Sequence, residues 1–181
     1  MKENPILLVT ESVTGNENPK KIWYSRSVAV GVAITDGARF IFEKRGSGCP
    51  DGVGQYCLPC GYLNWDESCE EAVVRETYEE IGIKLDKNLV KAGLFKVDSN
   101  PSNNRQNVLI FYFYRVSHEG FDEFLKTANE AIKVSNRGGE DNEVDEVVGI
   151  NFFNGDDKKF DFAFDHDKSV REAASFYGLY Y

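Results

Sequence analysis

The stretch Val108–Val116, which reads VLIFYFYRV, constrains the fold of this chain more than any other. Successive side chains of a β-strand point to opposite faces of the sheet, and here both sets of positions are apolar. A strand of this kind is buried on both sides, so it belongs in the interior of a sheet. The chain therefore needs a sheet with further elements packed against each face.

Other runs predict the elements around this strand. β-Branched and alternating apolar residues indicate further strands at Ile6–Val13, Ser27–Ile34, Phe40–Lys44 and Glu146–Phe153. Helical spacing and end signals indicate helices from the Ser68 cap to Gly82, at Gly120–Val134 and at Asp167–Tyr177. An open loop is expected between Gly46 and Gly54, which include four glycines and a proline. Strands and helices mixed in this way favour an α+β or α/β sandwich with a mixed β-sheet.

Length and charge narrow the class of protein. The 181 residues suit one domain with a single sizeable core, and no linker or repeat divides them. The net charge of −9 repels long polyanions, so we expect no nucleic-acid partner. A small phosphorylated ligand remains compatible with this charge if cations mediate its approach.

The expected compartment follows from apolar runs and cysteines. The longest apolar run near the N-terminus, Ile6–Val9, is too short for a signal peptide or a membrane span. The four cysteines, Cys49, Cys57, Cys60 and Cys69, suit a compartment where thiols stay reduced. We therefore expect a soluble cytoplasmic protein without a membrane partner.

The segment from Asp66 to Glu80 carries seven acidic side chains and one basic one, Arg75. In a helix, Glu76, Glu79 and Glu80 share one face. Two carboxylates about 4 Å apart repel by roughly 4 kcal/mol at an effective dielectric constant near 20, and one arginine cannot offset such a cluster. Mg²⁺ and Mn²⁺ prefer oxygen ligands, so this helix is interpreted as a metal platform. The alternative is a solvated charged face, which describes most glutamate-rich helices.

The flanking residues favour the metal platform. The stretch Gly61–Ile83 resembles the Nudix box: Gly, five residues, Glu, seven residues, Arg-Glu, an aliphatic residue, any residue, Glu-Glu, any residue, Gly and an aliphatic residue. Every position of fixed type is met, at Gly61, Glu67, Arg75, Glu76, Glu79, Glu80 and Gly82. Two positions depart from the pattern, because Thr77 replaces an aliphatic residue and Cys60 stands where the family often has glycine.

The resemblance implies a single Nudix hydrolase domain over residues 1–181. Its core would span about residues 22–155, with an N-terminal strand extension and a C-terminal helix. The implied fold is an α/β/α sandwich of the α+β class. The implied activity is hydrolysis of the diphosphate linkage in a nucleoside diphosphate joined to another moiety, with Mg²⁺ or Mn²⁺ as the cofactor.

The resemblance also implies a role for each residue of the box. The expected metal ligands are Glu76, Glu79 and Glu80, with the Gly61 carbonyl as a further ligand. Glu67 would assist at the metal or through its water shell, and Arg75 would hold the glutamates in orientation. Some relatives use a general base outside the box, and here Glu143 and Glu146 are the candidates. Each of these two also fits a surface position in an acidic loop.

Several alternatives stay open for substrate and function. ADP-ribose or a related sugar nucleotide is the first substrate candidate, because the run Phe162–His166 is similar to some ADP-ribose-directed members. A non-catalytic nucleotide sensor with the same fold is an alternative. An isopentenyl diphosphate isomerase-like enzyme is disfavoured because it needs a cysteine near a histidine in the sequence. The N-terminal runs Ile6–Val13 and Ile22–Ile34 could form a homodimer interface.

Four further groups of residues are candidates for functional roles. The spacing Cys57-x-x-Cys60 permits zinc binding or redox chemistry, but no second spaced pair exists, so buried thiols are favoured. Arg45 could touch phosphate, but a surface position is more typical of an arginine at a strand end. Five aromatic residues could either stack on a base or pack in the core, namely Trp23, Tyr24, Trp65, Phe95 and Tyr112. The polar residues 103–106 could contact the substrate.

Overall fold

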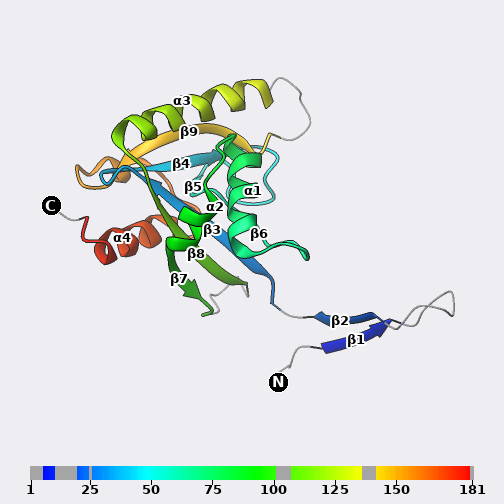
Figure 1. Cartoon of the computed structure of the whole chain (residues 1–181). Coiled ribbons are helices and arrows are strands. Elements are labelled where there is room, and N and C mark those ends of the chain that lie inside the picture. Colours follow the sequence, from blue (N-terminus) through cyan, green and yellow to red (C-terminus); the bar gives the residue numbers. More distant parts are fainter. Residues whose placement is uncertain (1–5, 11–19, 25, 101–106, 136–141, 180–181) are drawn as a thin grey trace.

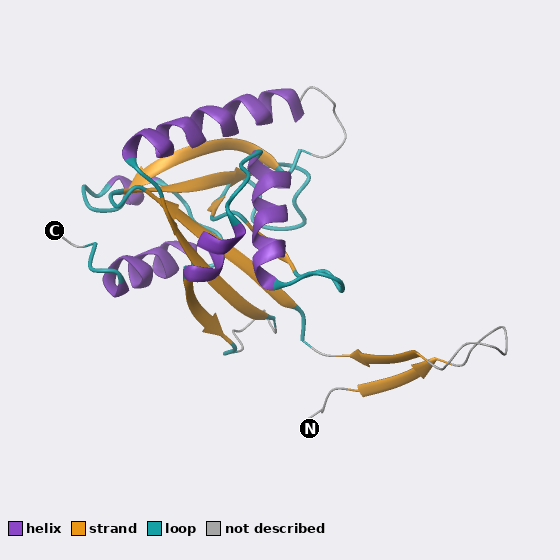
Figure 2. Ribbon diagram, viewed as in Figure 1, coloured by secondary structure: helices purple, strands orange, loops and turns teal. Residues whose placement is uncertain are grey.

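The fold is known from a computed structural model that describes residues 6–10, 20–24, 26–100, 107–135 and 142–179. Within these residues, seven strands form one mixed β-sheet with helices packed on both of its faces (Figures 1 and 2). The α+β sandwich with a mixed sheet expected from the sequence is confirmed. The polar segment 103–106, a candidate for substrate contacts, lies outside the described residues.

The strand order places the predicted interior strand inside the sheet. The strands are β3 (Val28–Thr35), β4 (Arg39–Arg45), β5 (Tyr56–Cys57), β6 (Cys60–Tyr62), β7 (Leu94–Asp98), β8 (Val108–Arg115) and β9 (Val144–Asn151). The path runs β5-β4-β3-β8-β7, while β6 also pairs with β3 and β9 with β4. Strands β3 and β8 are parallel, with Val28 opposite Val108 at one end and Thr35 opposite Arg115 at the other. The remaining pairs of this sheet are antiparallel.

Two N-terminal strands form a separate antiparallel sheet. They are β1 (Ile6–Thr10) and β2 (Lys20–Tyr24), and they extend away from the seven-stranded sheet in Figure 1. The last three residues of the predicted strand Ile6–Val13 lie outside the described residues. The run Ile22–Ile34, taken as one strand from the sequence, is divided between β2 and β3.

The helices cover both faces of the large sheet. They are α1 (Cys69–Ile81), α2 (Lys87–Ala92), α3 (His118–Ser135) and α4 (His166–Phe176), together with a short 3₁₀ helix at Asp156–Lys159. Helices α1, α2 and α3 contribute to one apolar cluster, and α4 contributes to the other. Among the described helices, none combines the length and apolar character that a bilayer crossing requires.

The alternation of side chains along β8 explains why both faces need a cover. Tyr112 and Tyr114 point into the cluster under α1 and α3, whereas Phe111 and Phe113 point into the cluster under α4. All four side chains are buried. Burying one large apolar side chain contributes about 1.5–3 kcal/mol, so a sheet with one bare face would forfeit much of this stabilisation.

Helix α1 begins and ends where the sequence predicts. The Ser68 side chain accepts a hydrogen bond from the Glu71 amide at 3.3 Å, and the Glu71 carboxylate accepts one from the Ser68 amide at 2.8 Å. This reciprocal pair is the predicted capping box. Gly82 ends the helix with φ of 69°, a left-handed conformation that favours glycine. The inward face carries Thr77, whose hydroxyl donates to the Val73 carbonyl, so a threonine fits this buried position.

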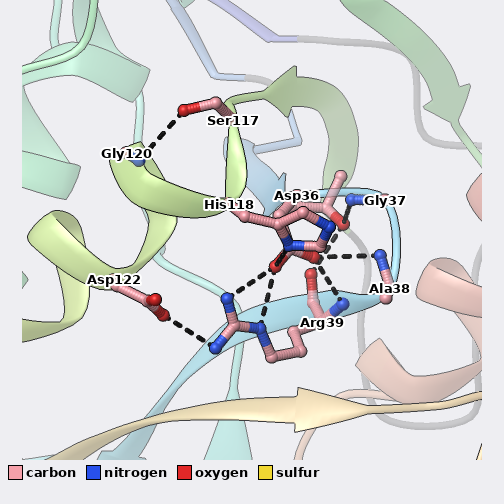
Figure 3. A network of polar contacts seen from close by, with 9 residues as sticks. Asp36, Gly37, Ala38, Arg39, Ser117, His118, Gly120 and Asp122 are labelled. Atoms are coloured by element: carbon pink, nitrogen blue, oxygen red, sulfur yellow. Dashed lines mark hydrogen bonds and ion pairs between the residues drawn. The ribbon is translucent and has the colours of Figure 1, made fainter.

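A buried aspartate in the turn between β3 and β4 connects the sheet to α3 (Figure 3). Asp36 Oδ1 accepts hydrogen bonds from the amides of Ala38 and Arg39, and Oδ2 contacts the Arg39 guanidinium and His118 Nδ1. Arg39 also pairs with Asp122 on α3 at 2.8 Å. Burial alone would raise the pKa of Asp36, but the two amides, Arg39 and His118 together lower it from 3.8 to about 2.

Candidate functional site

Strand β6 and helix α1 bring the two ends of the predicted box together. Helix α1 packs against β6 and β3, so Gly61 on β6 lies next to Glu76 on α1. A Cβ atom at Gly61 would lie 2.1 Å from the Glu76 carboxyl carbon. Any other residue here would displace the Glu76 carboxylate, whereas glycine lets the backbone lie directly against it.

Arg75 organises three of the predicted glutamates. Its Nε and Nη2 donate to the two Glu67 carboxylate oxygens at 2.9 and 2.6 Å, which is a bidentate pair. Its Nη1 lies 2.8 Å from Glu76 Oε1 and 2.9 Å from Glu79 Oε2. Its Nη2 also donates to the Tyr62 carbonyl at 3.0 Å. The arginine thus links α1 to β6 and fixes the directions of the carboxylates around it.

The same contacts affect the protonation of these groups. The pKa of Glu67 is lowered, chiefly by Arg75, and the pKa of Arg75 is raised, chiefly by Glu67. The pKa of Glu76 is raised, because burial outweighs the pairing with Arg75. Arg75 therefore stabilises the negative charge of Glu67, whereas it offsets the cost of burying the charge of Glu76 only in part.

Glu80 lies one turn beyond Glu76 and faces the Pro59-Cys60 segment. Its Oε2 accepts a hydrogen bond from the Cys60 amide at 2.9 Å. Burial raises its pKa well above the usual value, and the nearby Glu43 carboxylate raises it further. Cys60 lies opposite Gly31 in the β6–β3 pair. The departure from glycine at this position thus leaves the contact to Glu80 in place.

A groove of about 1140 Å³ opens over this part of the sheet. Gly61, Glu76 and Glu80 line it, as does Glu43 from β4. Its lining also includes four cationic side chains, which are Arg26, Arg45, Lys96 and Lys168. The combination of carboxylates and cations in one groove suits a ligand that is anionic and is held partly through bound metal.

The predicted site residues divide into two groups. Gly61, Glu76 and Glu80 meet in the groove, whereas Glu67 and Arg75 support them from beside it. Glu79, whose side chain is 57% exposed, pairs with Arg75 and does not line the groove. Glu79 nevertheless stays beside Glu76, because Arg75 Nη1 lies 2.8 Å from Glu76 Oε1 and 2.9 Å from Glu79 Oε2.

The two candidates for a general base are also separated. Glu143 lines the groove, and its backbone carbonyl accepts a hydrogen bond from the Gly46 amide at 2.7 Å. Glu146 lies on β9 and accepts a hydrogen bond from the Tyr56 hydroxyl at 3.0 Å. Burial and this carboxylate raise the pKa of Tyr56 to about 12. Of the two, Glu143 has access to the groove.

Arg45 corrects an expectation from the sequence. It is buried instead of lying on the surface, with its guanidinium 4.7 Å from the centre of the Phe164 ring. Its Nε donates to the Asp51 carbonyl at 2.9 Å. A β-bulge between Lys44 and Arg45 alters the alternation of the strand at this point, which a regular strand pattern does not reveal.

The aromatic candidates for base stacking do not converge on the groove. Trp65 is 87% exposed and Tyr112 is buried in the core, and neither lines the groove. The side chains of Trp23 and Tyr24 lie outside the described residues. The aromatic rings that do line the groove are Phe111, Phe164 and Tyr62.

Cys57, Cys60 and His166 form a cluster beside the carboxylates, with one potential ligand atom of each within 4.8 Å of the others. The Leu58 amide donates to His166 Nδ1 at 3.0 Å, so the ring proton of a neutral histidine is on Nε2. Neither nitrogen then offers a lone pair to a metal ion. The geometry favours hydrogen-bonded thiols over zinc, as the cysteine spacing also does.

The donor set of the groove fits a hard divalent cation. Glu76 and Glu80 supply carboxylate oxygens whose negative charge is only partly compensated by the protein. The glycine at position 61 lets the backbone approach Glu76 more closely than any other residue would. Mg²⁺ and Mn²⁺ are bound by oxygen donors of these types, so the residues present fit such an ion.

This fold and this arrangement of residues agree with a comparison with family models. The model of the NUDIX domain matches residues 25–172, so the chain belongs to the Nudix family. It shares its fold with Nudix and MutT hydrolases among the solved structures, and Nudix hydrolase is its enzyme class.

Three solved structures illustrate this similarity. A MutT NUDIX hydrolase from Burkholderia pseudomallei is 21% identical with a TM-score of 0.57, and the match covers 82% of this chain and 98% of that one. The NUDIX domain of Shewanella oneidensis NrtR, complexed with ADP ribose, is 16% identical with a TM-score of 0.56, covering 83% and 88%.

The third is a bifunctional NMN adenylyltransferase/ADP ribose pyrophosphatase from Francisella tularensis, complexed with AMP and a Mn ion. It is 17% identical with a TM-score of 0.57. The match covers 81% of this chain and 40% of the bifunctional enzyme, so the chain spans well under half of that protein.

Proposed function

We propose that this chain hydrolyses the diphosphate linkage of a nucleoside diphosphate derivative, with Mg²⁺ or Mn²⁺ as the cofactor and ADP-ribose or a related sugar nucleotide as the substrate. The observation that carries the proposal is the meeting of Gly61, Glu76 and Glu80 in one groove that also contains cationic side chains. A diphosphate bears two negative charges, and carboxylates alone would repel it.

The cation would be held by Glu76, Glu80 and the Gly61 carbonyl, with Glu79 as the third carboxylate of the set. When bound, it neutralises the diphosphate and polarises its phosphoryl oxygens. Arg75 keeps Glu76 in place through its contacts with Glu67 and the Tyr62 carbonyl. The arginine is a positioning residue, because its donors are engaged by these protein groups.

Glu143 is the proposed general base. Its side chain is exposed and lines the groove, so it can accept a proton from the attacking water. Lys96 also lines the groove and can contact the phosphates or the sugar hydroxyls from the protein side. Together these residues bind the ligand, orient it and move one proton.

The choice of ADP-ribose has three supports. Phe164 and His166, in the run that is similar to ADP-ribose-directed members, line the groove. The Shewanella oneidensis domain was solved with ADP ribose, and the Francisella tularensis enzyme with AMP and a Mn ion. A groove of about 1140 Å³ also exceeds the size of most small-ligand pockets, roughly 300–1,000 Å³, as a two-part ligand requires.

The test is a substrate panel with product identification. The purified chain is incubated with ADP-ribose, NADH, diadenosine polyphosphates, nucleoside triphosphates and isopentenyl diphosphate, each with Mg²⁺, with Mn²⁺ and with EDTA. We expect AMP and ribose 5-phosphate from ADP-ribose, only with cation present. Reaction in ¹⁸O-labelled water then shows which phosphorus is attacked.

A variant pair separates the site from the rest of the chain. Glu80→Gln keeps the size of the side chain but removes its charge, and we expect kcat to fall about 100-fold or more. Glu130→Gln, an exposed position on α3, should leave kcat unchanged. Undiminished turnover by Glu80→Gln, or binding of ADP-ribose without turnover by the unmodified chain, would contradict the proposal.

A further inference from the structure

Glu43 is a buried acid that the Nudix box does not include. It lies on β4 with 1% of its surface exposed. Side chains alternate along a strand, so Glu43 points to the same face as Ile41, whereas Phe40 and Phe42 point to the α4 side. Ile41 packs in the cluster that contains the inward face of α1. Glu43 therefore points toward the helix that carries the box glutamates.

One oxygen of this carboxylate has a partner and the other has none. Cys57, its neighbour across the β4–β5 pair, donates its thiol proton to Glu43 Oε1 at 3.4 Å. Within the part of the chain that the structure describes, Oε2 is buried without a hydrogen-bond partner. A buried carboxylate oxygen without a partner is strongly unfavourable unless a cation or a donor satisfies it.

The nearest cationic side chain is committed elsewhere. Arg45, two residues along the strand, donates through Nε to the Asp51 carbonyl and through Nη2 to the Asp51 carboxylate. Its Nη1 faces the Cys57 sulfur at 3.8 Å. The arginine reduces the unfavourable charge on Glu43 from a distance, but it makes no ion pair with it in the described residues.

Glu43 belongs to the same groove as the proposed cation ligands. It lines that groove together with Gly61, Glu76 and Glu80. The Glu43 and Glu80 carboxylates lie close enough for their charges to repel each other. One cation between them would remove this repulsion and satisfy Oε2, which no described protein group does.

We propose that Glu43 is an additional carboxylate ligand of the cation site, supplied by the sheet opposite the box helix and contacting the ion through Oε2. This inference rests on the proposed function, because it assumes that Glu80 binds a divalent cation. Cys57 is a positioning residue here, since its thiol holds Oε1 and leaves Oε2 for the ion.

The test measures cation binding without substrate. Titration of the unmodified chain with Mn²⁺, followed by the electron paramagnetic resonance signal of free Mn²⁺, gives the affinity and the number of ions bound. For Glu43→Gln we expect the affinity to fall about 10- to 100-fold, in the range seen when groups that support a metal site are removed. Glu70→Gln is the matched control, because Glu70 is partly buried on α1 but contacts Tyr112. It should bind Mn²⁺ as the unmodified chain does.

Thermal stability provides a second readout that separates a ligand from a structural residue. In EDTA, Glu43→Gln should melt no lower than the unmodified chain, because glutamine has the same shape and removes a repelling charge. The rise in melting temperature caused by Mn²⁺ should be smaller in the variant. A structural role predicts the reverse, namely a lower melting temperature in EDTA and an unchanged rise with Mn²⁺, and that result would overturn the proposal.

Two further outcomes keep the inference distinct from the proposed function. If Glu43→Gln fails to fold, Glu43→Asp retains the charge on a shorter side chain and should bind Mn²⁺ more weakly. Unchanged Mn²⁺ affinity in both variants would overturn the role of Glu43. If the chain binds Mn²⁺ through Glu43 but hydrolyses nothing in the panel, the proposed function fails while the ligand assignment is supported.

Discussion

Replacing Asp36 by asparagine tests how much the turn between β3 and β4 contributes to stability. The Asp36 side chain is fully inaccessible to solvent, so its contacts are not screened as surface pairs are. Asparagine can still accept from the Ala38 and Arg39 amides through one oxygen. Its amide group would place N–H donors against the Arg39 guanidinium, which is a donor itself, and would remove the charge that faces His118 Nδ1. The variant therefore loses the charged half of the network in Figure 3.

The pKa of Asp36 gives the magnitude. A folded-state pKa of about 2, against 3.8 as the ordinary value, corresponds to about 2.5 kcal/mol of stability at pH 7. Because the folded-state pKa is the lower one, this stability is present above pH 3.8 and is lost as the pH falls through about 2. At pH 3 roughly 1.3 kcal/mol should remain.

Urea unfolding followed by far-ultraviolet circular dichroism measures the difference at pH 7, 4 and 3. Tryptophan fluorescence is less suitable, because Trp65 is already 87% exposed in the folded chain. Asp122→Asn is the control, since Asp122 pairs with the same arginine but is 65% exposed. It should cost at most about 1 kcal/mol. The reasoning fails if Asp36→Asn costs under about 1 kcal/mol at pH 7, or if its cost does not shrink toward low pH.

Two glycine substitutions test the geometry around α1. Gly61→Ala would put a methyl group 2.1 Å from the Glu76 carboxyl carbon, so we expect kcat on the preferred substrate to fall about 10-fold or more with an unchanged circular dichroism spectrum. Near-normal turnover would show that Glu76 is free to move without consequence. Gly82→Ala combines a φ of 69° with a Cβ 2.6 Å from that of Ala131, and it should cost about 1–3 kcal/mol in urea unfolding. A loss within the error of the measurement would contradict the need for glycine there.

Strong local patterns made much of the fold predictable from the sequence. Val108–Val116 is apolar on both faces, and it is an interior strand with a cluster on each side. Ser68, Glu71 and Gly82 mark the ends of α1 by hydrogen-bonding and backbone preferences that need no tertiary context. The strand predicted at Glu146–Phe153 exists, but it begins at Val144, because its pairing with β4 extends to Arg45 beyond the bulge.

Elements with weak local patterns were not predicted. Strands β5 and β6 contain two and three residues, and they are strands because their backbones pair with β4 and β3. The short helix α2 and the edge strand β7 likewise lack a long periodic run. Such elements are fixed by the partner that they pair with, which sequence periodicity does not contain.

The site was predictable to a similar extent. Gly61, Glu76 and Glu80, which the resemblance to the box implied as metal ligands, lie together in the groove. The spacing did not predict that Glu79 is exposed and lies outside the groove lining while it pairs with Arg75. Glu43 was missed, although a single acid within the apolar run Phe40–Lys44 was a signal that could have drawn attention to it.

The loop from Gly46 to Gly54 has a consequence for how such a chain can diversify. Its two ends are joined, because the Gly54 amide bonds to the Arg45 carbonyl at 2.8 Å and the Arg45 amide to the Gln55 carbonyl at 2.9 Å. Three of its residues, Cys49, Pro50 and Asp51, border the groove. Insertions or exchanges inside this closed loop would reshape the entrance while the anchored strands keep the box in register. We therefore expect the loop to tolerate exchanges at the positions that border the groove better than at Gly46, whose amide bonds to the Glu143 carbonyl.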